Sequence, residues 1–327
     1  MVTLITGGAG FIGSAFVRLF AGKALKKVVI VDKLSYAGDL ARLKVAEGRY
    51  KFYKADICDE GKIDSIFRRE SPDIVLNFAA ETHVDRSINS AKAFLESNIL
   101  GVESLLKSSR KYKVKKFVHL STDEVYGDTK SGSFSEESVF CPSSPYAASK
   151  AAGDLLIKSY IRTYDFPAII IRPSNNYGPW QYPEKLIPRA ILKLFQNKLI
   201  PIYAKGKNVR EWLYVEDCAR GILAILKKGR LGQVYNLGSG LELQNIAVIG
   251  LLLKIMRKDR NQFEFVKDRL GHDFRYSLNS AKIRREIGWQ PQTTLEDGLR
   301  KTVAWAFAQR RWLESKAKEV EQLYKVT

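Results

Sequence analysis

Short apolar runs alternate with longer segments of helical spacing through the first half of the chain. The apolar runs are continuous, which indicates strands buried on both faces of a parallel sheet. The segments between them repeat apolar residues every three or four positions, as amphipathic helices do. This pattern predicts a doubly wound α/β fold. The expected strands are Val2–Thr6, Val28–Val31, Tyr50–Lys54, Ile74–Ala79, Phe117–Leu120 and Ala168–Arg172, and the expected helices are Ile12–Phe20, Ile63–Glu70 and Asn98–Ser109.

The pattern loosens after Arg172, where several prolines interrupt the chain. We therefore expect a first domain over residues 1–172, to which the chain returns at about 210–240. Residues 173–327 are expected to form mainly a second, smaller α/β lobe. Its expected elements, with those of the return, are helices at Pro188–Gln196, Val215–Lys227, Asn245–Arg257, Ser280–Ile287 and Leu295–Leu323, and strands at Val234–Leu237 and Phe263–Val266.

A glycine-rich turn between the first strand and the first helix indicates a dinucleotide site. The stretch Gly7–Gly13 satisfies the G-x-G-x-x-G spacing in the strand–turn–helix context that gives this motif its meaning. Glycines there permit a tight turn and let a pyrophosphate approach the helix N-terminus. Asp32 ends the second strand, and its carboxylate suits a ribose 2′-hydroxyl but repels a 2′-phosphate. The sequence therefore predicts a Rossmann-type domain that prefers NAD to NADP.

Acid and base groups gather after the fifth predicted strand. Thr122, Asp123 and Glu124 stand at its end, where folding alone does not require two adjacent carboxylates. Such a pair suits chemistry in which one group gives a proton and another takes one. Tyr146 and Lys150 are four residues apart on one helix face, where the ammonium can lower the pKa of the phenol.

Together these motifs resemble the extended short-chain dehydrogenase/reductase superfamily over nearly the whole chain. The Asp123–Glu124 pair narrows the resemblance to the nucleotide-sugar 4,6-dehydratases of the NAD-dependent epimerase/dehydratase family. This resemblance implies a hydro-lyase that acts on dTDP-glucose. Other stretches that carry it are Ala79–Ser87, Arg172–Pro179, Tyr182–Pro188, Arg210–Asp217 and Gly271–Tyr276.

The same resemblance implies a role for each catalytic group. Tyr146, beside Lys150, would take the proton of the sugar 4-hydroxyl, and Thr122 would hydrogen-bond the same oxygen. Glu124 would remove the hydrogen at C5, and a protonated Asp123 would donate to the departing 6-hydroxyl. The hydride taken from C4 returns at C6, so NAD is expected to stay bound.

The resemblance also implies two sets of binding residues. The NAD-binding set is Gly7, Gly10, Phe11, Ile12, Gly13, Asp32, Lys33, Leu34, Ser35, Asp56, Ile57, Ala79, Ala80, Thr82, Ser97, Tyr146, Lys150 and Asn176. The substrate-binding set is His83, Thr122, Asn175, Lys185, Leu186, Pro201, Tyr203, Arg210, Asn245, Asp268, Arg269 and His272.

Three other readings remain open from the sequence. A 4-epimerase or decarboxylase of the same superfamily would share the fold, although the Asp123–Glu124 pair argues against it. A uridine nucleotide is an alternative to thymidine, because Pro173 and Leu270 depart from the expected pattern near the nucleotide. A more remote alternative is a non-catalytic protein that senses a dinucleotide.

Composition restricts the remaining classes. The formal net charge of +19 raises the question of nucleic acid, but the basic residues are spread along the chain without interleaved aromatics. We therefore expect a basic enzyme surface and no specific nucleic-acid partner. Three scattered cysteines and three histidines show no metal-ligand spacing, so no metal site is expected. No apolar run has the length of a membrane span, and a cytoplasmic homodimer is expected.

Overall fold

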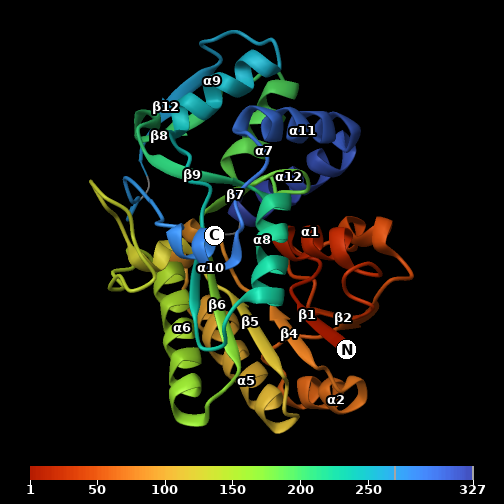
Figure 1. Cartoon of the computed structure of the whole chain (residues 1–327). Helices are drawn as coiled ribbons and strands as arrows, with labels where there is room; N and C mark the ends of the chain where they lie inside the picture. Colours follow the sequence, from red (N-terminus) through yellow and green to blue (C-terminus); the bar gives the residue numbers. More distant parts are fainter. Residues whose placement is uncertain (269, 326–327) are drawn as a thin grey trace.

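A computed structural model describes residues 1–268 and 270–325 (Figure 1). These residues form a larger lobe around a seven-stranded sheet and a smaller lobe around two short sheets. The predicted α/β class, a parallel Rossmann-type sheet with a smaller second lobe, is confirmed.

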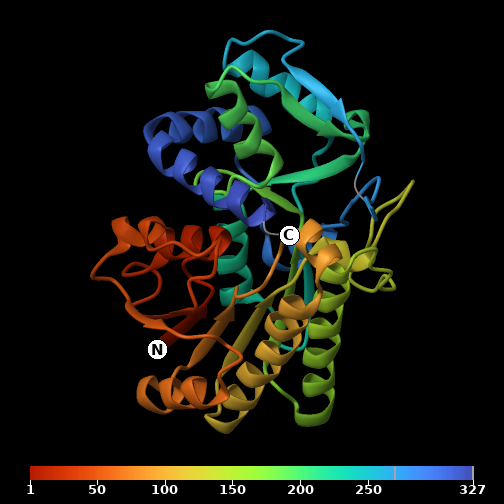
Figure 2. The ribbon, with the colours of Figure 1, turned by 180° about the vertical axis from the view of Figure 1, so that it is seen from behind.

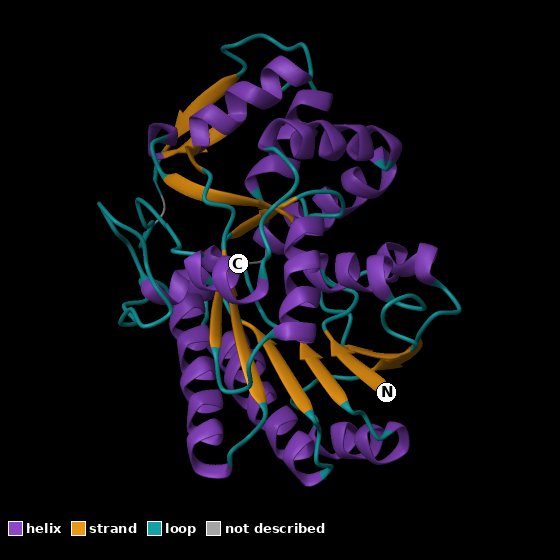
Figure 3. Cartoon of the chain, viewed as in Figure 1, coloured by secondary structure: helices purple, strands orange, loops and turns teal. Residues whose placement is uncertain are grey.

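The large sheet has the strand order β10-β6-β5-β4-β1-β2-β3, and all its strand pairs are parallel. The order reverses between β1 and β4, and ligands of open α/β sheets bind at such switch points. In Figure 3 the strand arrowheads point toward the smaller lobe, so the carboxyl ends of the strands open below it. The strands are β1 (Val2–Thr6), β2 (Lys27–Asp32), β3 (Lys51–Lys54), β4 (Ile74–Asn77), β5 (Lys116–Leu120), β6 (Ala168–Pro173) and β10 (Val234–Leu237).

Helices cover both faces of this sheet, which explains the continuous apolar runs of its strands. Leu4 and Ile5 are adjacent and fully buried, yet they belong to two different hydrophobic clusters, one on each face. Figures 1 and 2 show the two helical layers from opposite sides. One layer contains α1 (Phe11–Phe20), α8 (Val215–Lys228) and α10 (Ala281–Ile287), and the other contains α2 (Glu60–Glu70), α5 (Gly101–Lys111) and α6 (Pro145–Tyr164).

The smaller lobe packs its own hydrophobic cluster between short strands and four helices. Its strands are β7 (Asn175–Tyr177), β9 (Val209–Tyr214) and β11 (Glu242–Gln244) in one sheet, and β8 (Ile200–Tyr203) and β12 (Phe263–Val266) in another. Its helices are α7 (Leu186–Phe195), α9 (Asn245–Ile255), α11 (Leu295–Ala308) and α12 (Arg310–Lys325).

Short helical segments connect several of these elements. The 3₁₀ turn η3 (Asp123–Tyr126) follows β5 directly and carries both predicted catalytic carboxylates. The other segments are η1 (Leu40–Ala46), α3 (Val84–Asn89), α4 (Lys92–Leu95), the π-helical η2 (Glu96–Leu100) and η4 (Ala204–Gly206).

Every expected strand has a counterpart, whereas β7, β8, β9 and β11 were not expected. β7 and β11 have only three residues each, Pro201 lies within β8, and Arg210 and Glu211 interrupt the apolar residues of β9. None of the four therefore shows the continuous apolar run that identifies a buried strand. The predicted helix Leu295–Leu323 is two helices that meet at Gln309, where the backbone leaves the helical region at φ −111° and ψ 28°. The expected return at 210–240 includes β9, which lies in the smaller sheet, so the return to the large lobe begins with α8.

Over residues 1–268 and 270–325, no helix is both long and apolar enough to cross a membrane. The same residues contain no group of three acidic, histidine or cysteine side chains placed to hold a metal ion. All three cysteines are free thiols.

Candidate active site

The glycine-rich turn after β1 forms a bare backbone cradle at the N-terminus of α1. Gly7 has a φ of +67°, and a Cβ atom there would lie 2.5 Å from the amide nitrogen of Ala79. A Cβ atom on Gly13 would lie 2.3 Å from the carbonyl oxygen of Gly7. Side chains are therefore excluded from a turn that presents backbone N–H groups, and this cradle fits the pyrophosphate of a dinucleotide.

We expect Gly13→Ala to abolish retention of NAD, because the added methyl group must displace the Gly7 carbonyl in the cradle. The measurement is the cofactor content of the purified protein, with circular dichroism to verify folding. Gly250→Ala is the matched control: its Cβ meets nothing within 4 Å, so it should keep the cofactor. In α9 it should stabilise the protein by about 0.5–1 kcal/mol. Full cofactor content in Gly13→Ala would contradict the predicted cradle.

Charges at the ends of β2 and β3 favour a ribose over a 2′-phosphate. The Asp32 carboxylate accepts hydrogen bonds from the amides of Ala9 (2.9 Å) and Leu34 (2.8 Å). Lys33 could attract a phosphate, but its Nζ lies 3.4 Å from Asp56 and 3.8 Å from Glu81. Because two carboxylates already neutralise this lysine, the local charge agrees with the predicted preference for NAD.

Most of the predicted NAD-binding residues line one groove along this edge. The structure brings together in it Gly7, Gly10, Asp32, Lys33, Ser35, Asp56, Ile57, Ala79, Ala80 and Ser97. Phe11, Ile12 and Gly13 lie in the first turns of α1, and Leu34 follows Asp32. Asn176 instead lines the large cavity described below. Lys185 donates to the carbonyl oxygen of Thr82, which places Thr82 beside the same cavity.

The adjacent carboxylates of η3 have different surroundings. Asp123 is buried, and its Oδ1 accepts a hydrogen bond from the Thr122 hydroxyl at 3.1 Å while its Oδ2 has no partner. Burial raises the pKa of Asp123 well above its usual range, and the charges of Glu124 and Glu211 raise it further. Glu124 is half-buried and lies 3.5 Å from the Tyr276 hydroxyl. One carboxyl group therefore has a raised pKa and lies beside another that is more open to solvent.

Tyr146 and Lys150 extend from the first turns of α6, but their contacts differ from the sequence expectation. Lys150 Nζ donates to the carbonyl oxygen of Leu120 at 2.7 Å and lies 3.3 Å from His119 Nε2. Burial raises the pKa of Tyr146, Glu124 raises it further, and a hydrogen bond with Thr122 lowers it. Lys150 Nζ is directed toward the end of β5. The predicted effect of its charge on the phenol pKa stays a prediction.

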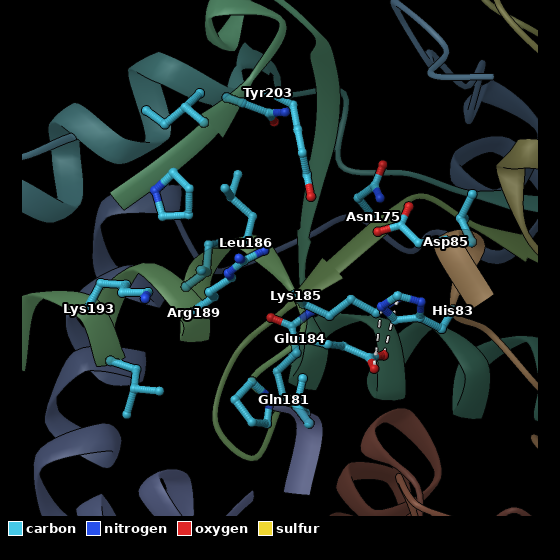
Figure 4. Close-up of a pocket in the computed structure, with 18 of the residues that line it drawn as sticks. His83, Asp85, Asn175, Gln181, Glu184, Lys185, Leu186, Arg189, Lys193 and Tyr203 are labelled. Atoms are coloured by element: carbon cyan, nitrogen blue, oxygen red, sulfur yellow. Dashed lines mark ion pairs between the residues drawn. The ribbon is translucent and has the colours of Figure 1, made fainter. Parts of the chain in front are cut away.

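A cavity of ≈ 540 Å³ lies between the large lobe and the smaller one (Figure 4). In Figure 4 the Lys185 side chain of the smaller lobe extends toward His83, which caps α3. Most of the predicted substrate residues line this cavity. They are His83, Asn175, Lys185, Leu186, Pro201, Tyr203, Arg210, Asn245 and His272.

Arg210 has a second, structural role, whereas Asp268 is not among the residues that line the cavity. The Arg210 guanidinium donates to the carbonyl oxygen of Val209 (2.7 Å), to that of Phe274 (3.2 Å), and to a third carbonyl, so it braces this segment as well as lining the cavity. Asp268 lies outside the cavity wall and contacts His272 Nδ1 at 2.6 Å. Arg269 lies outside the described residues. 

Two charged residues of the site, Glu184 and Arg42, were not predicted from the sequence. Glu184 lines the cavity, with its carboxylate 3.6 Å from His83 Nε2 and 3.7 Å from Lys185 Nζ (Figure 4). Arg42 is buried and donates to the carbonyl oxygen of Ala9 (3.0 Å) in the glycine-rich turn. Glu184 directly precedes Lys185 and Leu186, two predicted substrate residues, so a signal for it existed. Nothing in the sequence around Arg42 indicates a buried charge.

A dinucleotide cradle, an acid–base cluster at the mouth of β5 and a cavity under a second lobe define an NAD-dependent sugar-modifying enzyme of the short-chain dehydrogenase/reductase type. The chain belongs to the GDP-mannose 4,6-dehydratase family, whose model matches residues 4–302.

Individual relatives narrow this further. The dTDP-glucose 4,6-dehydratase of Shigella flexneri is 46% identical over 96% of this chain and 95% of its own length. The enzyme of that name from Streptomyces niveus is 44% identical over 96% of this chain and 95% of its own length. These matches confirm the resemblance to dTDP-glucose 4,6-dehydratases.

Solved structures agree with the fold and the cofactor. DesIV, a dTDP-glucose 4,6-dehydratase from Streptomyces venezuelae with NAD and TYD bound, aligns with a TM-score of 0.93 and 46% identity, covering 97% of this chain and 100% of that one. A UDP-glucose 4-epimerase from Thermotoga maritima aligns with a TM-score of 0.89 but 30% identity, covering 94% of this chain and 99% of that one. The fold is thus shared with epimerases, whereas the sequence is nearer to the dehydratases.

Proposed function

We propose that this protein is an NAD-dependent hydro-lyase that converts dTDP-glucose into dTDP-4-keto-6-deoxyglucose and water. The observation that carries the proposal is the Asp123–Glu124 pair, in which a buried carboxyl group with a raised pKa lies beside a more exposed one. Dehydration needs both groups on the same substrate, because a proton leaves C5 while a hydroxyl leaves C6. The dTDP-glucose 4,6-dehydratases with 44–46% identity over nearly the whole chain support the same assignment.

The residues divide the reaction among them. Tyr146 takes the proton of the 4-hydroxyl, and Thr122, within hydrogen-bond reach of Tyr146 and Asp123, holds the same oxygen. NAD, held along the glycine-rich turn and Asp32, supplies the hydride acceptor at C4 and returns the hydride at C6. Glu124 removes the C5 proton, which the 4-ketone makes acidic, and returns a proton to C5 when the hydride is delivered to C6. Asp123 gives its proton to the departing 6-hydroxyl.

The test is incubation of the purified protein with dTDP-glucose, followed by chemical detection of the 4-keto-6-deoxy product. UDP-glucose in a parallel reaction decides the nucleotide, because Pro201, Tyr203 and Asn245 in the cavity wall are the predicted base contacts. Recovery of a galactose epimer in place of the keto sugar would exclude dehydration and support the epimerase alternative.

We also propose a homodimer, with an interface formed by α4, η2 and α6. These elements are in contact and expose large apolar side chains to solvent, with Leu100 58%, Leu155 56% and Leu95 47% exposed. An exposed apolar face of this kind is typical of a subunit interface.

Leu155→Glu is expected to convert the dimer to a monomer, because two like charges would oppose each other near a two-fold axis. Light scattering at micromolar concentration measures the mass directly. Leu231→Glu, at an equally exposed leucine outside this face (49% exposed), should leave the mass unchanged. A monomeric wild-type protein would contradict the proposed dimer.

The cytoplasmic location and the absence of a specific nucleic-acid partner remain predictions from the sequence. A mobility-shift titration checks the second, since attraction by charge alone weakens steeply as salt is raised.

A further inference from the structure

A ladder of three polar side chains crosses neighbouring strands of the large sheet behind the active site. Thr6, Asn77 and His119 are register partners on the neighbouring strands β1, β4 and β5, and each is at most 1% exposed. The Thr6 hydroxyl donates to Asn77 Oδ1 at 2.6 Å, and Asn77 Nδ2 lies 3.0 Å from His119 Nδ1. The far side of the His119 ring faces Lys150, with 3.3 Å between Nε2 and Nζ.

The hydrogen bonds of Asn77 determine which ring nitrogen of His119 carries the proton. Asn77 Oδ1 also accepts from the backbone amide of Ala79 at 3.2 Å, and a backbone amide can only donate. The oxygen is therefore fixed on that side, and the NH₂ group must face His119 and donate to Nδ1. A neutral ring with a bare Nδ1 carries its proton on Nε2.

The ring is neutral because its surroundings oppose a positive charge. Full burial lowers the pKa of His119 well below its usual range, and the charges of Lys150 and Arg172 lower it further. The Nε2–H group therefore points at Lys150 Nζ. An ammonium group offers only N–H groups in return, whereas an amine offers a lone pair that accepts the hydrogen bond.

We propose that His119 is a positioning residue for Lys150, and that Asn77 holds its ring in the tautomer that favours the uncharged amine. The inference rests on the proposed function, in which the charge of Lys150 supports proton removal by Tyr146. His119 then sets the upper pH at which this charge persists.

The other groups around Lys150 act in the opposite direction or pair with one another. Asp154, on the same helix, favours the ammonium, and its orphaned Oδ1 lies 3.9 Å from His119 Nε2. Its Oδ2 accepts from Arg172 Nε of β6 at 2.8 Å.

Arg172 in turn donates to the Tyr126 hydroxyl at 2.7 Å, and the charge of Lys158 interacts with those of Arg172 and Asp154. The Leu120 carbonyl accepts from Lys150 in either protonation state. Burial lowers the pKa of Lys150 to about 8, so the equilibrium between its ammonium and amine forms falls in an experimentally accessible pH range.

The first experiment reads the tautomer without turnover. The chain has three histidines, so ¹⁵N-histidine labelling of the holoenzyme gives three ring systems, and His119→Phe identifies the signals of His119. We expect a protonated Nε2 and a bare Nδ1 in the wild type. In Asn77→Asp the new carboxylate accepts at Nδ1, so the proton should appear there. A wild-type ring protonated on Nδ1 overturns the inference, even if the enzyme dehydrates dTDP-glucose normally.

The second experiment measures the rate of bound NADH formation after rapid mixing with dTDP-glucose, as a function of pH. In the wild type this rate should fall as pH rises through the Lys150 pKa. His119→Phe keeps a ring but removes the N–H group, so the ammonium persists longer and the alkaline limb should move up by about one pH unit.

Controls separate this role from a merely structural one. Val118→Ala alters the neighbouring buried residue on β5, so it should lower the melting temperature without moving the limb. His119→Gln retains a polar amide near the Nε2 position and should restore part of the wild-type profile. An unchanged alkaline limb in folded His119→Phe overturns the proposal. Failure of the wild type to form a keto sugar would refute the proposed function instead, and the tautomer result would still stand.

Discussion

Glu124→Gln is expected to form bound NADH from dTDP-glucose and then stop before dehydration. The glutamine amide has nearly the shape of the carboxylate but cannot accept the C5 proton, whereas oxidation at C4 depends on Tyr146 and Lys150. Loss of a positioned general base lowers a rate by about 10²–10⁴-fold. Rapid-mix absorbance follows the first step, and release of the keto sugar follows the second.

Measuring both NADH formation and keto-sugar release in Glu124→Gln shows which step the substitution blocks. Glu137→Gln, the same substitution at an exposed residue, should change neither rate. Loss of both steps in the variant would place Glu124 in substrate binding or oxidation rather than in C5 deprotonation. Unchanged product formation would remove it from the mechanism.

The large lobe could be predicted from the sequence because parallel strands buried on both faces leave a strong local signal. Successive residues such as Leu4 and Ile5 pack into apolar clusters on opposite faces of the sheet. Apolar residues can therefore follow one another along the strand, whereas a strand with one buried face is apolar at every second position. The smaller lobe leaves a weaker signal, since strands such as β7 and β11 have three residues each and depend on tertiary pairing. Helix α12 was joined to α11 because Gln309 is a good helix former and only packing reveals the turn there.

For the site, spacing predicted which residues meet but not how their protons are held. The i, i+4 rule placed Tyr146 and Lys150 on one helix face, as the structure shows. It could not show that Lys150 is directed toward His119, because that contact joins α6 to β5. A signal for His119 did exist, because it is a polar residue between the apolar residues Val118 and Leu120 of a buried strand that ends just before the catalytic turn. Glu211, which raises the pKa of Asp123, comes from the smaller lobe and had no local signal.

Asp123→Asn is expected to lower dehydration by about 10²–10⁴-fold, because the amide can hydrogen-bond the 6-hydroxyl but cannot give it a proton. Oxidation at C4 should persist, as in Glu124→Gln. In the wild type the acid must be protonated, so its contribution is complete at low pH and is lost as pH rises through its raised pKa. The pH profile of product formation, measured against that of bound NADH, isolates this loss.

The same substitution should make the protein more stable while it makes the enzyme slower. The folded-state pKa of Asp123 is raised above the unfolded value near 3.9, so between these two pKa values the folded state binds more protons than the unfolded state. The contribution of Asp123 to stability therefore falls as pH rises through this window. Asparagine does not titrate, so the melting temperature of Asp123→Asn relative to wild type should increase from pH 5 to pH 8.

This opposition between stability and rate distinguishes a catalytic acid from a carboxyl group that caps a turn. A capping carboxylate would stabilise η3 when ionised, so replacing it would cost stability at high pH. Asp123 instead has one oxygen that accepts a hydrogen bond from Thr122 and another that is buried without a partner. The Thr122 bond favours the charged form, but the opposing effect of burial is larger, so the pKa is raised. Asp165→Asn, at an exposed residue, should change neither the rate nor the pH dependence of melting. A melting temperature of Asp123→Asn that falls relative to wild type toward pH 8 would show that the carboxylate is ionised in the folded protein and would exclude it as the acid.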